Sequence, residues 1–401
     1  MNNNKVAFIS YYSHQADLFE SLKEKLNKLN NFQAFHLKSN QILCKGLIKN
    51  LVRARKKTEN IEKIIYYSDL RFRFSRGVKG DDFFNGLHRK IISFAAKNLY
   101  SSFFNFFQAR DVDLVVIWNG YRFQAASAVQ AAESLDIKCL FLENGFFPET
   151  LVMDEEGVNA ANSLQNKNKN FYKAIKVKEE KLKSFKESSL EQRQLRGVKG
   201  KISYRDELPL PDEFVFLPFQ VLTDTQIIVN SPHIKSMEKL FVLTYRAVRK
   251  YNEKRGKDLY LVVKEHPSDF NKRDYSKLKE KYRNEKVKFL VKTPVEKIID
   301  EAEAVITINS TVGIEALLKH KPVITLGEAF YNVQDLVYHV EEPGNLYSVL
   351  DRALNGGVNP DLIDRFIYFL KFHYLVEADR ERKNEDDLQA IITRIKNVLT
   401  K

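Results

Sequence analysis

The stretch Ala304-Val-Ile-Thr-Ile-Asn-Ser-Thr-Val-Gly-Ile-Glu-Ala-Leu-Leu318 decides the fold class. It opens with a continuous apolar run, Ala304–Ile308, which is typical of a strand buried on both faces. A short polar turn with a glycine follows, and the apolar residues after it have helical spacing. A buried strand that passes through a short turn into a helix is the repeating unit of a parallel α/β sheet. The stretch therefore predicts an α/β protein.

The same unit recurs along the whole chain. Further apolar strands are predicted, each near a helical pattern, at 5–10, 113–118, 139–142, 214–218, 260–264, 287–290 and 322–326. They fall into two series, so we expect two Rossmann-like parallel-sheet domains that face a cleft, where open α/β sheets bind ligands. The predicted bounds are 1–205 for an N-terminal domain that ends in the basic segment, 206–345 for a C-terminal domain, and 346–401 for helices that pack back towards the N-terminal domain.

The composition restricts the class of protein and its cellular compartment. The 401 residues are 44% hydrophobic and 29% charged, which is ordinary for a globular protein. No uncharged apolar run is long enough to span a membrane, and the N-terminus lacks the apolar core of a signal peptide. Cys44 and Cys139 are too few for a disulfide framework or a zinc knuckle. We therefore expect a cytoplasmic protein without a metal or other cofactor.

The positive charge is concentrated in particular segments. The net charge is +13, and residues 167–205 alone hold thirteen Lys or Arg against four Glu. This segment predicts a solvated helix followed by a mobile link at 196–201. Nucleic acid, an anionic membrane surface and an anionic substrate would each explain such a balance, as would a solvated face without a partner. No nucleic-acid-binding module is recognisable, and the aromatic stretch 94–107 favours peripheral contact with an anionic membrane surface as a hypothesis.

Polar residues follow the predicted strands of the C-terminal series. Ser310, Thr311 and Gly313 would offer N–H and hydroxyl donors to a phosphate, and Glu315 would reach a ribose diol. The alternative is an ordinary N-cap with a surface Glu. His266, in the turn Glu265-His-Pro267, could donate to a phosphate or protonate a leaving group, or it could be structural.

Two carboxylates are candidates for the chemistry. Asp224 lies among uncharged hydrogen-bonding residues, including Gln220 and Gln226, and could act as a nucleophile, as a base or only as a helix N-cap. Glu143 and Asn144 end a predicted strand of the N-terminal series, where Glu143 could supply a second carboxylate or simply be solvated. Asn119 is a weaker candidate of the same kind.

Four motifs resemble those of a known family. They are Glu143-Asn-Gly-x-x-Pro-x-Thr150, Leu217-Pro-Phe-Gln-Val-x-Thr-Asp-Thr-Gln226, Glu265-His-Pro267 and Ser310-Thr-Val-Gly-Ile-Glu-Ala-Leu-Leu318. Together they are similar to the capsule-polysaccharide β-Kdo glycosyltransferases of the KpsC/KpsS type, which include the Kdo-transferase module of WbbB-like O-antigen enzymes. The resemblance covers about half of the chain, from Phe141 to Tyr331, and one copy of the motif set is present.

The resemblance implies a GT-B-like fold and a retaining transfer of Kdo from CMP-β-Kdo to a lipid-linked or polysaccharide acceptor, without a metal. It makes Asp224 the expected nucleophile and Glu143 the acid/base, although the reverse assignment stays open. His266, Ser310, Thr311 and Gly313 would hold the phosphate, with Glu315 at the ribose; Gln220, Gln226 and Asn144 complete the expected binding set.

Two other functions remain alternatives. One is another cytidine-nucleotide-dependent transferase, either sialyltransferase-like or CDP-glycerol phosphotransferase-like, since both also use a His-Pro turn. The other is a non-catalytic component for polysaccharide binding or export that retains a transferase fold. The presence of Asp224, Glu143, His266 and Glu315 together favours an enzyme.

Overall fold

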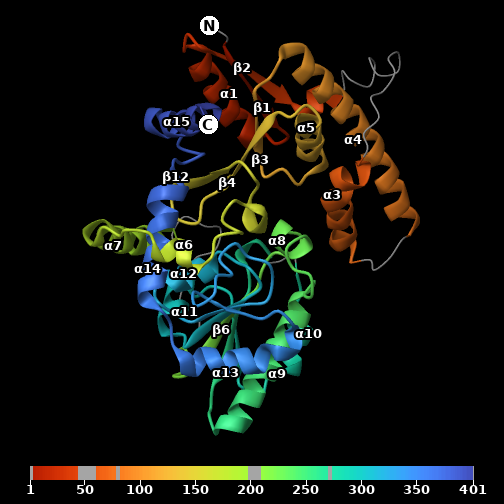
Figure 1. The fold of residues 1–401 in the computed structure, drawn as a ribbon. Coiled ribbons are helices and arrows are strands. Elements are labelled where there is room, and N and C mark those ends of the chain that lie inside the picture. Colours follow the sequence, from red (N-terminus) through yellow and green to blue (C-terminus); the bar gives the residue numbers. More distant parts are fainter. Residues whose placement is uncertain (1–2, 44–59, 78–81, 197–208, 270–272, 401) are drawn as a thin grey trace. The chain divides into compact units, whose positions relative to one another are not determined.

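The computed structural model describes residues 3–43, 60–77, 82–196, 209–269 and 273–400. The chain forms two compact units: Met1–Ser163 with Tyr374–Lys401, and Leu164–His373. The expected division at residue 205 differs from this one, because the basic segment after Ser163 belongs to the second unit. The expected tail is also divided, since only its last part joins the first unit (Figure 1).

The first unit contains a six-stranded mixed sheet. In spatial order its strands are β12 (Val376–Glu377), β5 (Thr150–Asp154), β4 (Lys138–Asn144), β3 (Leu114–Trp118), β1 (Asn4–Ser10) and β2 (Phe32–Lys38). The predicted strands β4, β3 and β1 pair in parallel, as expected, and β2, which was not predicted, pairs in parallel with β1. Strand β5 runs antiparallel to β4, and β12 antiparallel to β5. The antiparallel strands were not predicted, because no helix separates β5 from β4.

Helices cover both faces of this sheet. On β1, Val6 and Phe8 belong to one core and Ala7 and Ile9 to the other, which is the alternation expected of a strand buried on both sides. The first core includes α1 (Ser13–Asn27) and α15 (Glu385–Thr400); the second includes α3 (Ile61–Arg76), α4 (Phe83–Arg110) and α5 (Phe123–Glu133). The short helix η1 (Asn159–Ala161) follows β5.

The second half of α4 corrects one expectation. The rings of Phe103, Phe104 and Phe107 are buried in the core of the first unit. The aromatic stretch 94–107 is therefore mostly core and is not free to contact a membrane. The exposed aromatic residues of α4 lie nearer its beginning.

The second unit contains a six-stranded sheet in which every pair is parallel. Its spatial order is β11 (Tyr338–His339), β10 (Val323–Thr325), β9 (Ala304–Thr307), β6 (Phe214–Pro218), β7 (Tyr260–Lys264) and β8 (Val287–Leu290). One face packs on α9 (Met237–Arg255) and α13 (Leu346–Gly356), while α11 (Val295–Glu301) and α12 (Val312–Leu318) contact β6 and β9. The remaining helices are α6 (Lys169–Lys173), α7 (Glu179–Arg196), α8 (Thr225–Ile228), η2 (Pro267–Asp269), α10 (Ser276–Lys281), η3 (Pro343–Asn345), α14 (Pro360–Phe369) and the π-helix η4 (Leu370–Tyr374), which extends to the unit boundary.

The basic segment is only partly as predicted. It contains the expected helix, α7, but Leu182 and Phe185 of that helix are buried, so it is not solvated on all sides. The predicted link at 196–201 lies, beyond Arg196, outside the described residues, as does Cys44. Among the described helices, none is both long and apolar enough to cross a membrane.

A matched pair of glycine substitutions tests the packing of the Glu143-Asn-Gly145 turn. A Cβ at Gly145 would lie 2.0 Å from Oγ1 of Thr150 and 2.6 Å from its backbone carbon. Gly86, inside helix α4, has no atom within 4 Å of the same position. We expect Gly145→Ala to lower the free energy of unfolding by about 2 kcal/mol or more, because that packing cannot relax. Gly86→Ala should raise it by roughly 0.5–1 kcal/mol, since alanine favours a helix interior.

Urea denaturation followed by circular dichroism measures both changes. Equal effects of the two substitutions would contradict the close packing described for Gly145.

Candidate functional site

The predicted donor-side residues come together because their strands are neighbours. Strand β6 pairs with both β7 and β9 in parallel, so the loops after these strands leave the same edge of the second sheet. Asp224 follows β6, His266 follows β7 and Ser310 follows β9. The structure thus groups the residues that the sequence placed at strand ends.

Asp224 is both a helix cap and an exposed carboxylate. It is the N-cap of α8, and its Oδ1 accepts a hydrogen bond from the N–H of Gln226 at 2.9 Å. The structural alternative given for this residue is therefore correct. The side chain remains exposed, so the cap does not remove the carboxylate from solvent or from a substrate.

His266 is held in one tautomer near Asp224. Its Nδ1 accepts a hydrogen bond from the N–H of Ser268 at 3.1 Å, which places the ring proton on Nε2. Burial lowers the pKa of His266, and the charges of Asp269 and Asp224 only partly oppose this effect. The imidazole is consequently a neutral Nε2–H donor near pH 7, close enough to Asp224 to feel its charge.

Gln220 and Gln226 have structural partners around Asn309. The side chain of Gln220 donates to Oδ1 of Asn309 at 3.1 Å and accepts from Thr307 and Ile308 at the end of β9. Asn309 is buried, and its amide donates to the carbonyl oxygens of Gln226, Asn230 and Glu328. These hydrogen bonds of Asn309 connect the loops that follow β6, β9 and β10.

The role of Asn309 was missed at the level of the sequence. A signal was present, because Asn309 is the first polar residue after a buried strand. Gln220 and Gln226, which were expected at the nucleotide, both make hydrogen bonds within the protein, and their contact with a nucleotide stays a prediction.

The loop after β9 combines hydroxyl groups with tight packing. Oγ of Ser310 accepts from the N–H of Val312 at 3.2 Å, and Thr311 is exposed where α12 begins. Gly313 serves packing, since a Cβ there would lie 2.8 Å from the hydroxyl of Tyr331, which itself donates to the carbonyl of Ser310. Glu315 is partly exposed in the first turn of α12.

A second polar group lies in the first unit, at the ends of the paired strands β3 and β4. The amide of Asn119 donates to Oε2 of Glu143 at 2.6 Å, and Oε1 of Glu143 accepts from the N–H of Asn144 at 2.8 Å. Asn119 and Gly120 both have positive φ, +64° and +89°, so a tight turn after β3 directs the amide towards Glu143. The weaker candidate Asn119 is thus a direct partner of a stronger one.

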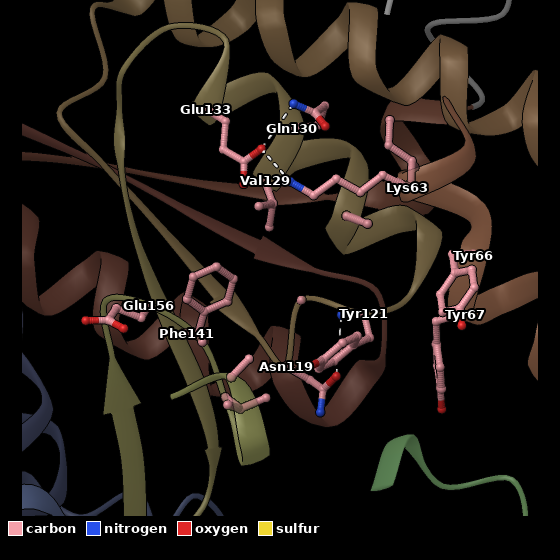
Figure 2. A pocket seen from close by; sticks show the side chains of 16 residues that line it. Lys63, Tyr66, Tyr67, Asn119, Tyr121, Val129, Gln130, Glu133, Phe141 and Glu156 are labelled. Atoms are coloured by element: carbon pink, nitrogen blue, oxygen red, sulfur yellow. Dashed lines mark hydrogen bonds and ion pairs between the residues drawn. The ribbon is translucent and has the colours of Figure 1, made fainter. Parts of the chain in front are cut away.

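A cavity of about 350 Å³ opens beside Asn119 (Figure 2). Its aromatic lining comes from Tyr66, Tyr67, Tyr121 and Phe141. Phe141 and Glu143 lie two residues apart on β4 and therefore on the same face of the sheet. Lys63, Gln130 and Glu133 form a polar cluster at another part of the lining, with Lys63 and Glu133 ion-paired at 3.0 Å.

The polar groups offer chemistry but no metal centre within the described residues. No group of three or more His, Cys, Asp or Glu side chains there could hold a metal ion. Asn119, Glu143 and Asn144 belong to the first unit and the other candidate residues to the second. Each unit thus presents a carboxylate with a nitrogen donor beside it.

The chain is similar to proteins of capsule polysaccharide synthesis and export. Residues 179–342 match the family described as "Capsule polysaccharide biosynthesis protein". Protein FixF of Sinorhizobium fredii is 38% identical over 268 residues, which are 66% of this chain and 60% of FixF. The capsule polysaccharide export protein KpsS of Escherichia coli is 32% identical over 148 residues, 34% of this chain and 37% of KpsS. The chain thus spans less than two thirds of these relatives.

A solved structure supports the fold. KpsC of Thermosulfurimonas dismutans, described as a beta Kdo 2,7 transferase, aligns over 98% of this chain and 99% of its own with a TM-score of 0.50 at 15% identity. The expected GT-B-like class, with two mostly parallel α/β sheets, is confirmed. These matches agree with the resemblance to capsule polysaccharide proteins of the KpsC/KpsS type that the motifs gave.

The lowered pKa of His266 predicts a pH dependence of stability. Between about pH 7 and pH 5 the unfolded chain binds a proton at this histidine more readily than the native chain does, so stability falls as the pH falls. His266→Gln removes this contribution. The melting temperature of the wild type should therefore drop more steeply across that range than that of the variant.

Differential scanning calorimetry at both pH values makes the comparison. His233→Gln, at an exposed histidine of the same unit, controls for the loss of an imidazole. Parallel slopes for the wild type and His266→Gln would contradict the assigned environment of His266.

Proposed function

We propose that the chain is a retaining glycosyltransferase that moves Kdo from CMP-β-Kdo to a lipid or glycan acceptor during synthesis of a capsule or related surface polysaccharide. The observation that carries the proposal is the pairing of an exposed carboxylate, Asp224, with a neutral Nε2–H donor, His266, at one sheet edge of a unit that matches the capsule family. The transferase named for T. dismutans KpsC, which shares the fold, favours the same reaction class.

On the donor side, the proposed roles follow from what each group can donate or accept. His266 donates from Nε2 to a phosphate oxygen of CMP, and Ser310 and Thr311 supply hydroxyl donors to the same group. A nucleoside monophosphate carries a single phosphate, so hydrogen-bond donors can stabilise it as it leaves without a metal. Glu315, one turn into α12, accepts from the ribose hydroxyls.

Retention of configuration is explained by two displacements. In the first, the Asp224 carboxylate attacks the anomeric carbon of Kdo, the bond from that carbon to the phosphate oxygen breaks, and CMP departs with the electron pair. In the second, an acceptor hydroxyl attacks the glycosyl ester, the ester bond breaks, and the hydroxyl proton passes to a base, Glu143. Asp224 ends the cycle as a free carboxylate.

The first unit supplies the acceptor side of the proposal. Glu143 is oriented by Asn119, which also lines the aromatic cavity. Tyrosine and phenylalanine rings such as Tyr121 and Phe141 suit the apolar faces of sugar rings, while amide groups suit their hydroxyls. A glycan end or the sugar of a lipid-linked acceptor therefore matches this lining.

The intact mass of the protein after incubation with CMP-Kdo, generated in situ, tests the nucleophile. The wild type should gain the mass of one Kdo residue, and Asp224→Asn should show none of this adduct. Asparagine caps a helix as well as aspartate does, so the substitution removes the charge and keeps the cap of α8. Asp274→Asn is the matched control, because Oδ1 of Asp274 accepts from the N–H two residues on at 2.8 Å in the same geometry.

The outcomes separate the alternatives. An adduct on Asp224→Asn but not on Glu143→Gln would reverse the roles of the two carboxylates. Release of CMP without any adduct would contradict the two-step route and favour a front-side mechanism. With neither adduct nor CMP, CMP-sialic acid and CDP-glycerol are assayed as donors; inactivity with all of them would favour a non-catalytic component.

Glu143→Gln provides a second prediction. The adduct should still form, because Glu143 acts on the acceptor, while transfer to the acceptor should fall by about 10²- to 10⁴-fold, the usual contribution of a general base. Single-turnover measurement of adduct formation and decay separates the two steps. An unchanged decay rate would exclude Glu143 as the base.

A further inference from the structure

The exposed face of the first half of α4 is apolar. Phe83 is 77% exposed, Phe84 61%, Leu87 45%, Ile91 58% and Phe94 44%. Residues 84, 87, 91 and 94 follow one another at helical spacing and so form one stripe along the helix. We call residues 83, 84, 87, 91 and 94 the apolar stripe.

The stripe is an outward face and not part of the core. The opposite side of the same helix, which includes Asn85, Ile92 and Ala96, is buried, and α4 packs on α3 and α5. Figure 1 shows α3 and α4 running side by side within the first unit. A helix that already has its core contacts does not need large apolar residues on its solvent side. Their presence indicates a surface for interaction.

The charges around the stripe select the partner. Helix α4 contains no Asp or Glu in its 28 residues, whereas Lys90 and Lys97 are exposed at positions adjoining the stripe. Arg76, at the end of α3, lies over the ring of Phe84 at 5.1 Å. Apolar side chains interleaved with long cationic ones match the boundary between acyl chains and anionic headgroups, where lysine keeps its amine in the polar layer.

We propose that the apolar stripe docks this chain on the surface of an anionic phospholipid bilayer. Phe84, Leu87, Ile91 and Phe94 enter the headgroup boundary, while Lys90 and Lys97 contact lipid phosphates. The stripe takes the place of the stretch 94–107 that the sequence indicated. The inference does not depend on the transferase chemistry, because vesicle binding is measured without donor or acceptor.

Vesicle co-sedimentation tests both components of the surface. The full chain should bind vesicles of phosphatidylcholine with about one third phosphatidylglycerol, and bind pure phosphatidylcholine at least about tenfold more weakly. Phe84→Ser with Ile91→Ser should weaken binding to the anionic vesicles by about tenfold or more, because serine gains no free energy by leaving water for the bilayer, whereas phenylalanine and isoleucine do. Lys90→Glu with Lys97→Glu should do the same through charge.

A charge-matched control lies on α7, within the basic segment 167–205. Lys181 and Lys183 are exposed there, and Lys181→Glu with Lys183→Glu changes the net charge by the same amount. We expect this control to bind like the wild type. If it loses as much binding as the α4 charge variant, the attraction is general and the proposal is wrong. Unchanged melting temperatures show that each variant is folded.

Fluorescence locates the stripe relative to the bilayer. The chain has one tryptophan, Trp118, and it is buried. The indole introduced by Phe94→Trp should shift its emission to the blue on anionic vesicles and be quenched by brominated acyl chains. Absence of both effects would overturn the proposal. A dimer in sedimentation velocity would do so too, in favour of a second copy of the chain, if Phe84→Ser with Ile91→Ser dissociates it and vesicles do not.

Discussion

Parallel pairing of neighbouring strands is the constraint on which the candidate chemistry depends. Parallel strands end at one edge of a sheet, so residues far apart in the sequence become neighbours when their strands are adjacent. In the second unit β6 lies between β7 and β9, which brings Asp224 and His266 into electrostatic contact. In the first unit β3 and β4 do the same for Asn119 and Glu143. The same physical rule thus generates a carboxylate with a nitrogen donor in each unit.

Buried polar contacts then hold these strand ends in place. Asn309 is satisfied by three backbone carbonyl oxygens and by the side chain of Gln220, all on loops that leave the same sheet edge. A fully bonded buried network of this kind is rigid, since any displacement leaves a donor or acceptor without its partner. This rigidity keeps the loop that begins at Ser310 in a fixed relation to the helix that Asp224 caps. The close approach of Gly313 to Tyr331 fixes the same loop from its other side.

The sequence predicts the parallel strands well and the surrounding features less well. Strands β6, β7 and β8 have the predicted bounds, because their residues are mainly the β-branched, aromatic and aliphatic types that favour strands. The antiparallel β5 and the short β12 could not be found from a pattern of alternating strands and helices. Likewise, aromatic composition alone cannot tell which side of α4 faces the core, so the exposed residues were placed too far along the helix.

The candidate residues show the same division. Residue type and position after a strand predicted where Asp224, His266 and Glu143 lie in the fold, while their chemical roles stay predictions. Which amides serve the protein and which face a ligand depends on the partners across the sheet edge. The sequence around Gln220 and Gln226 does not show that their side chains bond to Asn309, because Asn309 lies more than 80 residues away and comes close only in the folded chain.

We propose that the sheet edge of the second unit is a cytidine nucleotide site. A crystal structure of the full chain with CMP would test it most directly. We expect the CMP phosphate within hydrogen-bond distance of Nε2 of His266 and of the Ser310 or Thr311 hydroxyl, with the ribose at Glu315. CMP bound elsewhere, or with its phosphate turned away from His266, would contradict it.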